Sequence, residues 1–137
     1  MTPPRPLDAV SPALRAAFAA RGFTTLTSIQ EAVLDPALAE SDLRIFSQTG
    51  SGKKAAVGLA IAPALERAAA EPPAEGAAKP FALVIAPTRE LATQIGGELT
   101  WLFAPMGVGV AAVTGGANYA REMASLRKRP LVIAGTP

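Results

Sequence analysis

A glycine-rich stretch that contains lysine offers the clearest chemistry in this chain. Residues 47–54 read SQTGSGKK, and an alanine-rich segment follows them. Glycines let the backbone curl so that successive N–H groups point at one anion, and a lysine ammonium can reach its outer oxygens. A helix beginning there adds the positive end of its dipole. The stretch predicts a phosphate-binding loop, and the alternative interpretation is a turn that only needs small residues.

One position of this loop departs from the usual nucleotide-binding pattern. Lys54 follows Lys53 where such loops normally carry serine or threonine. The missing hydroxyl would ligate Mg²⁺, whereas an ammonium has no lone pair to offer a metal. Lys53 is therefore the expected phosphate ligand, and the sequence predicts poor Mg²⁺ binding.

The composition excludes several classes of protein. The 137 residues include no cysteine and no histidine, so disulfides, thiolate zinc sites and histidine bases are excluded. Half of the residues are hydrophobic, which is typical of a soluble globular chain. The net charge of +2 does not by itself indicate nucleic acid. No apolar run is long enough to span a membrane, and the absence of cysteine favours a cytoplasmic location.

The elements that must position the loop alternate along the sequence. Ser11 and Thr27 are expected to start two helices, the second disturbed by Pro36. Helices are expected over 12–21, 28–40, 53–69, 89–103 and 118–129, and strands over 43–46, 81–86, 108–113 and 131–134. The strand at 81–86, FALVIA, is expected to be buried on both faces.

Strands that alternate with helices predict an α/β fold with a parallel sheet and helices on both faces. The carboxyl ends of parallel strands meet at one edge of a sheet, where ligands bind. The segments 47–54, 87–91, 114–116 and 135–137 are therefore expected to gather at that edge.

Five stretches in this order resemble the first RecA-like domain of a DEAD-box RNA helicase. They are GFTTLTSIQ at 22–30, SQTGSGK at 47–53, APTRELATQ at 86–94, TGG at 114–116 and AGTP at 134–137. APTRELA with an upstream SQTGSGK is highly specific, whereas TGG alone would mean nothing. The resemblance implies a RecA-like P-loop domain, incomplete because the sequence stops before the Asp-Glu-Ala-Asp motif. It also implies a Q-motif helical lead-in over 1–40 and a partial helicase ATP-binding domain over 41–137.

The resemblance implies an ATP site. Gln30 would read the adenine edge, because a carboxamide both donates and accepts, and Phe23 would stack on the base. Without the other motifs, they would read as a surface glutamine and a core phenylalanine. The implied ATP-binding residues are Phe23, Thr27, Gln30, Ser47, Gln48, Thr49, Gly50, Ser51, Gly52, Lys53 and Lys54, with Lys53 also catalytic. ATP and Mg²⁺ are the implied cofactors, with Mg²⁺ in question at Lys54.

The resemblance also implies contact with the RNA backbone. The implied residues are Pro87, Thr88, Arg89, Gly115, Gly116 and Thr136. A guanidinium and a helix N-terminus suit phosphates, and backbone contacts carry little sequence preference. The basic run at 127–129 lies at the far end of its helix and is interpreted as a solvated helix end.

The implied activity of a full-length parent is ATP hydrolysis coupled to local separation of RNA duplexes. The alternative is a degenerate helicase domain that holds RNA or a protein partner without hydrolysing ATP. A P-loop ATPase of another class is a third interpretation, which PTRELA disfavours. Leu26 is a further departure, since the Q motif usually carries proline there.

Overall fold

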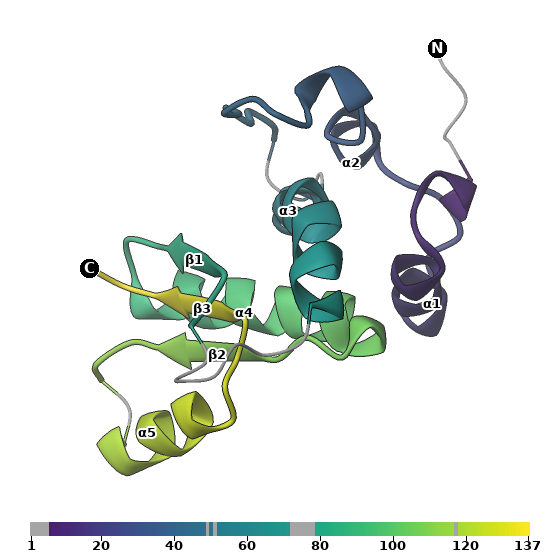
Figure 1. The fold of residues 1–137 in the computed structure, drawn as a ribbon. Helices are drawn as coiled ribbons and strands as arrows, with labels where there is room; N and C mark the ends of the chain where they lie inside the picture. Colours follow the sequence, from purple (N-terminus) through teal and green to yellow (C-terminus); the bar gives the residue numbers. More distant parts are fainter. Residues whose placement is uncertain (1–5, 49, 51, 72–78, 117) are drawn as a thin grey trace.

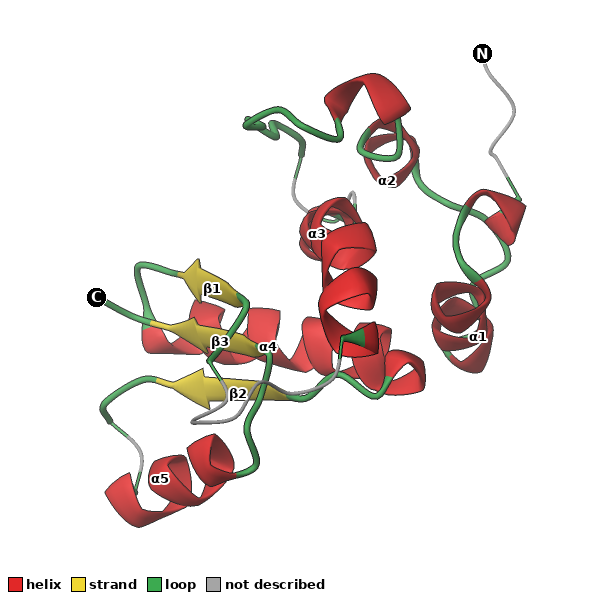
Figure 2. Cartoon of the chain, in the orientation of Figure 1, coloured by secondary structure: helices red, strands yellow, loops and turns green. Residues whose placement is uncertain are grey.

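A computed structural model of the protein describes residues 6–48, 50, 52–71, 79–116 and 118–137. The described residues form a three-stranded sheet together with α-helices and short 3-10 helices (η), and the N-terminal helices lie to one side of the sheet (Figures 1 and 2). In chain order the elements are η1 Leu7–Ala9, α1 Pro12–Ala20, α2 Ser28–Ala32, η2 Pro36–Leu38, α3 Lys53–Ala70, β1 Ala82–Ile85, α4 Arg89–Phe103, η3 Ala104–Met106, β2 Val110–Val113, α5 Tyr119–Arg127 and β3 Val132–Gly135.

The helices begin where the sequence supplies capping side chains. Ser11, Thr88 and Asn118 each accept a hydrogen bond from a backbone N–H in the first turn of the helix that follows. The second expected helix is interrupted before Pro36, where η2 begins. The starts after Ser11 and Thr88 and the interruption before Pro36 confirm the expectations from the sequence, whereas Asn118 caps the last helix and is not its first residue.

The strands form a parallel sheet in the order β1-β3-β2, as expected. Helix α4 lies against one face of this sheet and meets it at Gly96. A Cβ at Gly96 would stand 3.6 Å from Ala112 Cβ and 3.8 Å from Ala134 Cβ, so this point of the interface consists of small residues. Helix α5 contacts the sheet at β2.

Two expectations about the strands are wrong. Residues 43–46 form no strand, and Phe46 is 82% exposed. A strand needs a neighbour for its N–H and C=O groups, and β1, β3 and β2 pair only with one another in the described chain. Consequently the glycine loop does not join the sheet edge, and the start of α3 lies beside α2 instead (Figure 1).

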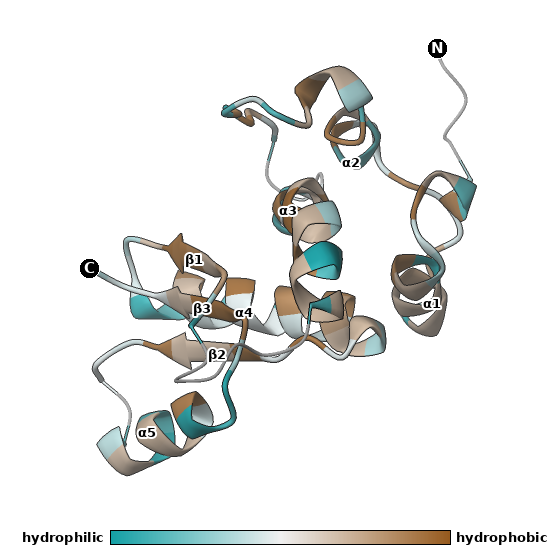
Figure 3. Cartoon of the chain, viewed as in Figure 1, coloured by the Kyte–Doolittle hydropathy of each residue, from teal (hydrophilic) through white to brown (hydrophobic). Residues whose placement is uncertain are grey.

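Strand β1 is also not buried on both faces. Val84 packs against the core, but Leu83 is 65% and Ile85 63% exposed. The reason is that α4 covers only one face of the sheet. Helix α5 contacts β2, which is the edge strand farthest from β1. The hydropathy colouring in Figure 3 shows β1 as predominantly hydrophobic, so its uncovered side is an apolar surface.

One hydrophobic core joins the N-terminal helices to the sheet. Its fully buried members include Phe18 of α1, Leu59 of α3, Leu99 of α4 and Val132 of β3. Leu26 is 3% exposed and belongs to the same core, which gives the departure from proline a packing role. No helix in the described part of the chain is long and apolar enough to cross a membrane.

Strand β1 provides a test of this arrangement. We expect L83K combined with I85K to reduce self-association of the chain, because lysine on an exposed edge strand opposes pairing between chains. The free energy of unfolding should change by less than about 0.5 kcal/mol per substitution, since both side chains are exposed. Light scattering and denaturant unfolding measure the two effects.

V84K is the matched control, because Val84 lies between these residues and packs against the core. It should destabilise the fold by several times as much, through burial of an unpaired charge. Similar destabilisation by all three substitutions would show that β1 does not present alternating buried and exposed sides.

Candidate functional site

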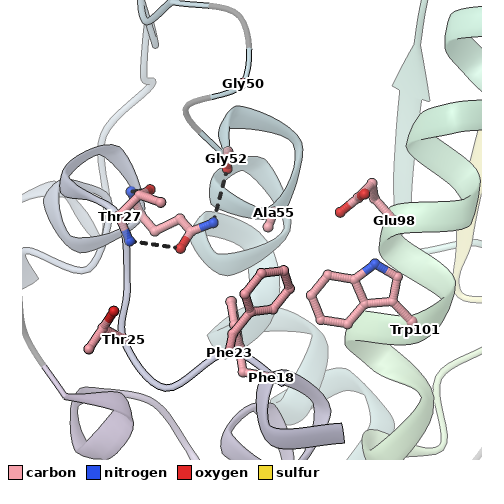
Figure 4. A pocket seen from close by; sticks show the side chains of 10 residues that line it. Phe18, Phe23, Thr25, Thr27, Gly50, Gly52, Ala55, Glu98 and Trp101 are labelled. Atoms are coloured by element: carbon pink, nitrogen blue, oxygen red, sulfur yellow. Dashed lines mark hydrogen bonds between the residues drawn. The ribbon is translucent and has the colours of Figure 1, made fainter. Parts of the chain in front are cut away.

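A pocket of about 230 Å³ lies between the N-terminal segment, the start of α3 and helix α4 (Figure 4). Its walls come from three parts of the sequence that only folding brings together. The lining residues are Phe18, Phe23, Thr25, Thr27, Gln30, Gly50, Gly52, Ala55, Glu98 and Trp101. The pocket therefore joins the GFTTLTSIQ stretch to the glycine loop.

Gln30 makes that connection directly. Its side chain is buried, with the residue only 6% exposed. The carboxamide Oε1 accepts from the Thr27 N–H at 3.0 Å, and Nε2 donates to the Gly52 carbonyl at 3.3 Å, across 22 positions of sequence. The Gln30 N–H donates to Thr27 Oγ1 at 3.4 Å, which completes a capping box at the start of α2.

Half of the hydrogen-bonding capacity of the Gln30 amide remains. A carboxamide has two N–H donors and two acceptor positions. One donor is used by Gly52 and one acceptor position by Thr27. Within the described part of the chain, one donor and one acceptor position are left for a ligand, on a group that is already held in place.

Glycine is required at position 52 for two reasons. Its φ of 85° lies in the left-handed region, where side chains are disfavoured. A Cβ there would also overlap the Gln30 carboxamide. Gly50 has a similar φ of 83°, so the loop turns twice before α3. The implied ATP-binding residues Thr49 and Ser51 lie outside the described residues.

The two lysines are the first residues of α3. Lys53 is exposed and Lys54 is half-buried, and α3 begins without a side-chain cap. Ammonium groups at the positive end of a helix dipole favour an anion. Ser47 is half-buried and Gln48 exposed, and neither lines the pocket. The described residues contain no group of three acidic side chains that could hold a metal ion.

Aromatic side chains form the apolar wall of the pocket. Phe23 is 50% exposed, and its ring centroid lies 6.1 Å from that of Phe18 and 6.2 Å from that of Trp101. The Arg21 guanidinium lies 5.0 Å from the Trp101 ring centroid, a cation–π contact. Phe23 and Gln30 line the same pocket, which therefore combines an aromatic surface with an amide.

Sequence reasoning missed the contribution of α4 to this pocket. Glu98 and Trp101 are three residues apart and so lie on one side of the helix. Glu98 is the one ionisable side chain among the residues that line the pocket, and Figure 4 shows its carboxylate directed toward it. The buried Trp101 Nε1 has no hydrogen-bond partner in the described chain. In the sequence, only the three-residue spacing of Glu98 and Trp101 could have indicated that both lie on one side of a helix.

A second group of the residues singled out by sequence lies at the carboxyl edge of the sheet. Thr88 caps α4, and Arg89 is the first residue of that helix. The Arg89 guanidinium lies against Gly116, where any Cβ would overlap it. Thr136 Oγ1 donates to the Thr114 carbonyl at 3.4 Å and so joins the ends of β3 and β2.

The arrangement suits contact with phosphates. Pro87, Thr88, Arg89 and Gly116 are exposed, and Gly115 turns the chain with a φ of 71°. A helix start, a guanidinium and closely approachable backbone meet here. Because the glycine loop lies elsewhere, the candidate nucleotide pocket and the candidate phosphate-contact edge are separate sites.

Comparison with known proteins adds the family context. Residues 27–137 match the family model described as DEAD/DEAH box helicase. The ATP-dependent RNA helicase CshA of Listeria monocytogenes is 40% identical over 116 residues, which cover 85% of this chain and 21% of that protein. This chain therefore spans about a fifth of the length of that curated relative.

Solved structures show the same fold. The RNA helicase Prp28 from Chaetomium thermophilum, bound to ADP, matches with a TM-score of 0.80 and 30% identity, covering 100% of this chain and 33% of that one. Mss116p, bound to ssRNA and AMP-PNP, matches with a TM-score of 0.80, covering 99% of this chain and 28% of that one. At 23% identity the latter likeness supports the fold alone. The matches confirm the expected partial RecA-like domain with its parallel sheet.

Trp101 provides a direct probe of the pocket, because it is the single tryptophan of the chain and lines the cavity. We expect ADP to change its fluorescence saturably. G52A should weaken this binding by about tenfold or more, because the new methyl group displaces the Gln30 amide. G97A is the control, since nothing lies within 4 Å of a Cβ there. Equal ADP affinity of the two variants would show that ADP does not bind in this pocket.

Proposed function

This chain belongs to the DEAD/DEAH box helicase family, and we propose that it is the N-terminal segment of an ATP-dependent RNA helicase, where it binds ATP and the RNA backbone. The observation that carries the proposal is the hydrogen bond from Gln30 Nε2 to the Gly52 carbonyl. This bond joins the Gln30 amide to the glycine loop, which supports a base-reading role for the amide and a phosphate-binding role for the loop. The relative from Listeria monocytogenes is itself named an ATP-dependent RNA helicase.

Adenine fits the hydrogen-bonding groups that Gln30 has left. A glutamine amide pairs with adenine by donating to N7 and accepting from the N6 amine. Guanine presents oxygen O6 in place of that amine, so two acceptors would face each other. Phe23, half exposed in the same pocket, offers its ring for stacking on the base.

The phosphates would lie at the start of α3. Loop N–H groups and the Lys53 ammonium supply the positive charge there, and phosphoryl transfer depends on positioning and charge stabilisation. The described residues do not fit Mg²⁺, because Lys54 offers no lone pair and no acidic cluster accompanies it. We propose that the carboxylates needed for hydrolysis belong to a longer parent protein.

RNA would bind at the carboxyl edge of the sheet. Arg89 and the N–H groups at the start of α4 suit phosphate oxygens, and Gly115 and Gly116 let the RNA backbone approach closely. Pro87, Thr88 and Thr136 complete the proposed face. No base-reading group is needed for this mode, so we propose binding with little sequence preference.

Lys54 favours a second candidate function. Without the metal-binding hydroxyl, the same pocket could hold nucleotide, or the same face RNA or a protein, without turnover. The chain would then be a degenerate helicase domain that acts as a binding module. The effect of restoring the hydroxyl decides between the two functions.

Gln30 tests the adenine proposal in the full-length parent. We expect Q30A to weaken ATP by about tenfold or more and GTP much less, because only adenine pairs with the amide. Q94A is the control, since that amide is exposed and is not among the lining residues. Equal weakening of ATP and GTP, measured by equilibrium competition, would exclude base reading by Gln30.

Lys54 tests the metal proposal. We expect K54T in the full-length parent to raise ATPase activity at least about tenfold, a barrier change of about 1.4 kcal/mol, because it restores the Mg²⁺ ligand. K79T removes the same charge at an exposed position outside the pocket and should leave the rate unchanged. An unchanged rate in K54T would mean that another group holds the metal.

A further inference from the structure

Glu122 of α5 holds the loop that follows β2. Its Oε1 accepts from the Thr114 N–H at 2.9 Å and from the Gly115 N–H at 3.3 Å. The Thr114 hydroxyl donates to the same oxygen at 3.5 Å. Glu122 is half-buried, and in the sequence it follows Thr114 by eight residues and Gly115 by seven. One carboxylate oxygen therefore collects three donors from the loop.

These contacts determine where Gly116 lies. The chain turns at Gly115, whose φ of 71° lies in the left-handed region, and Gly116 then passes beneath the Arg89 guanidinium. A Cβ at Gly116 would overlap the Arg89 guanidinium, so a side chain there would force the guanidinium to move. Release of the loop from Glu122 would move Gly116 and remove the surface on which Arg89 rests.

The negative charge of Glu122 is unfavourable at a face that is proposed to bind phosphates. An anion at a phosphate-binding face repels RNA unless nearby groups compensate its charge. The loop N–H groups supply that compensation, and the same bonds leave them unavailable to an RNA phosphate. Incoming phosphates are thereby directed to Arg89 and the start of α4.

We propose that Glu122 is a positioning residue for RNA binding, which fixes the Thr114–Gly116 loop so that Arg89 faces the RNA backbone. The inference rests on the proposed RNA-binding function. It assigns the role to the acceptor oxygen of Glu122 rather than to its charge. A glutamine at this position retains that oxygen, so the two contributions are separable.

The experiment compares E122A and E122Q in the full chain. Binding of a fluorescent single-stranded RNA is measured by anisotropy at fixed salt, because salt alone shifts such affinities. E122A should bind about fivefold or more weakly, whereas E122Q should remain within about twofold of the unmodified chain, since its amide oxygen still accepts. E71A is the control for loss of a negative charge, because Glu71 is exposed at the end of α3.

Two further measurements separate positioning from general stability. Hydrogen exchange of the Thr114 and Gly115 amides should accelerate in E122A and stay slow in E122Q, while the core amides of α4 are unaffected. G116A should weaken RNA binding as E122A does, because it displaces Arg89 and leaves Glu122 in place. G116A therefore tests the same geometry if E122A does not fold.

The other outcomes overturn the inference. Tighter RNA binding by E122A would mean that Glu122 blocks a phosphate site in the loop. Equal losses in E122A and E122Q would assign the effect to charge, and an unchanged affinity of E122A would remove the role altogether. If the unmodified chain does not bind RNA, the proposed function is overturned as well. If it binds RNA and E122A binds equally well, only the Glu122 inference is overturned.

Discussion

The close packing of helix α4 is the constraint on which the other elements depend. It contacts α1 and α3 through its buried leucines and Phe103, and it meets β2 and β3 at Gly96. Burial of one such leucine contributes about 1.5–3 kcal/mol. Both candidate sites rely on this packing, because Arg89 begins the helix and Trp101 lies near its other end.

Local signals predicted much of the fold. The helix starts after Ser11, Thr27 and Thr88 follow from capping chemistry, which involves neighbours in sequence only. The strand expected at 43–46 failed because strand formation depends on a partner, which composition does not reveal. The same limitation explains β1: an apolar run predicts a buried strand, but only the surrounding elements decide which of its faces is covered.

The candidate site was predictable to different degrees. Gln30 and the glycine loop were found through separate motifs, and their hydrogen bond required the fold. Trp101 and Glu122 were not found, because a tryptophan or a glutamate on an amphipathic helix has no distinctive pattern. The boundary at residue 40 stays a prediction, although core residues on both of its sides pack together.

The hydrogen bonds of Gln30 also have a consequence for the entropy of recognition. A free glutamine side chain loses about 1.5–2 kcal/mol of rotamer freedom when it is immobilised. Thr27 and Gly52 already immobilise this one during folding, so a ligand finds its amide preorganised. Arg89, by contrast, is exposed, and its guanidinium lies against Gly116 without a hydrogen bond that fixes it within the described residues. The candidate pocket therefore offers a ligand a preorganised amide, whereas the sheet edge offers exposed side chains.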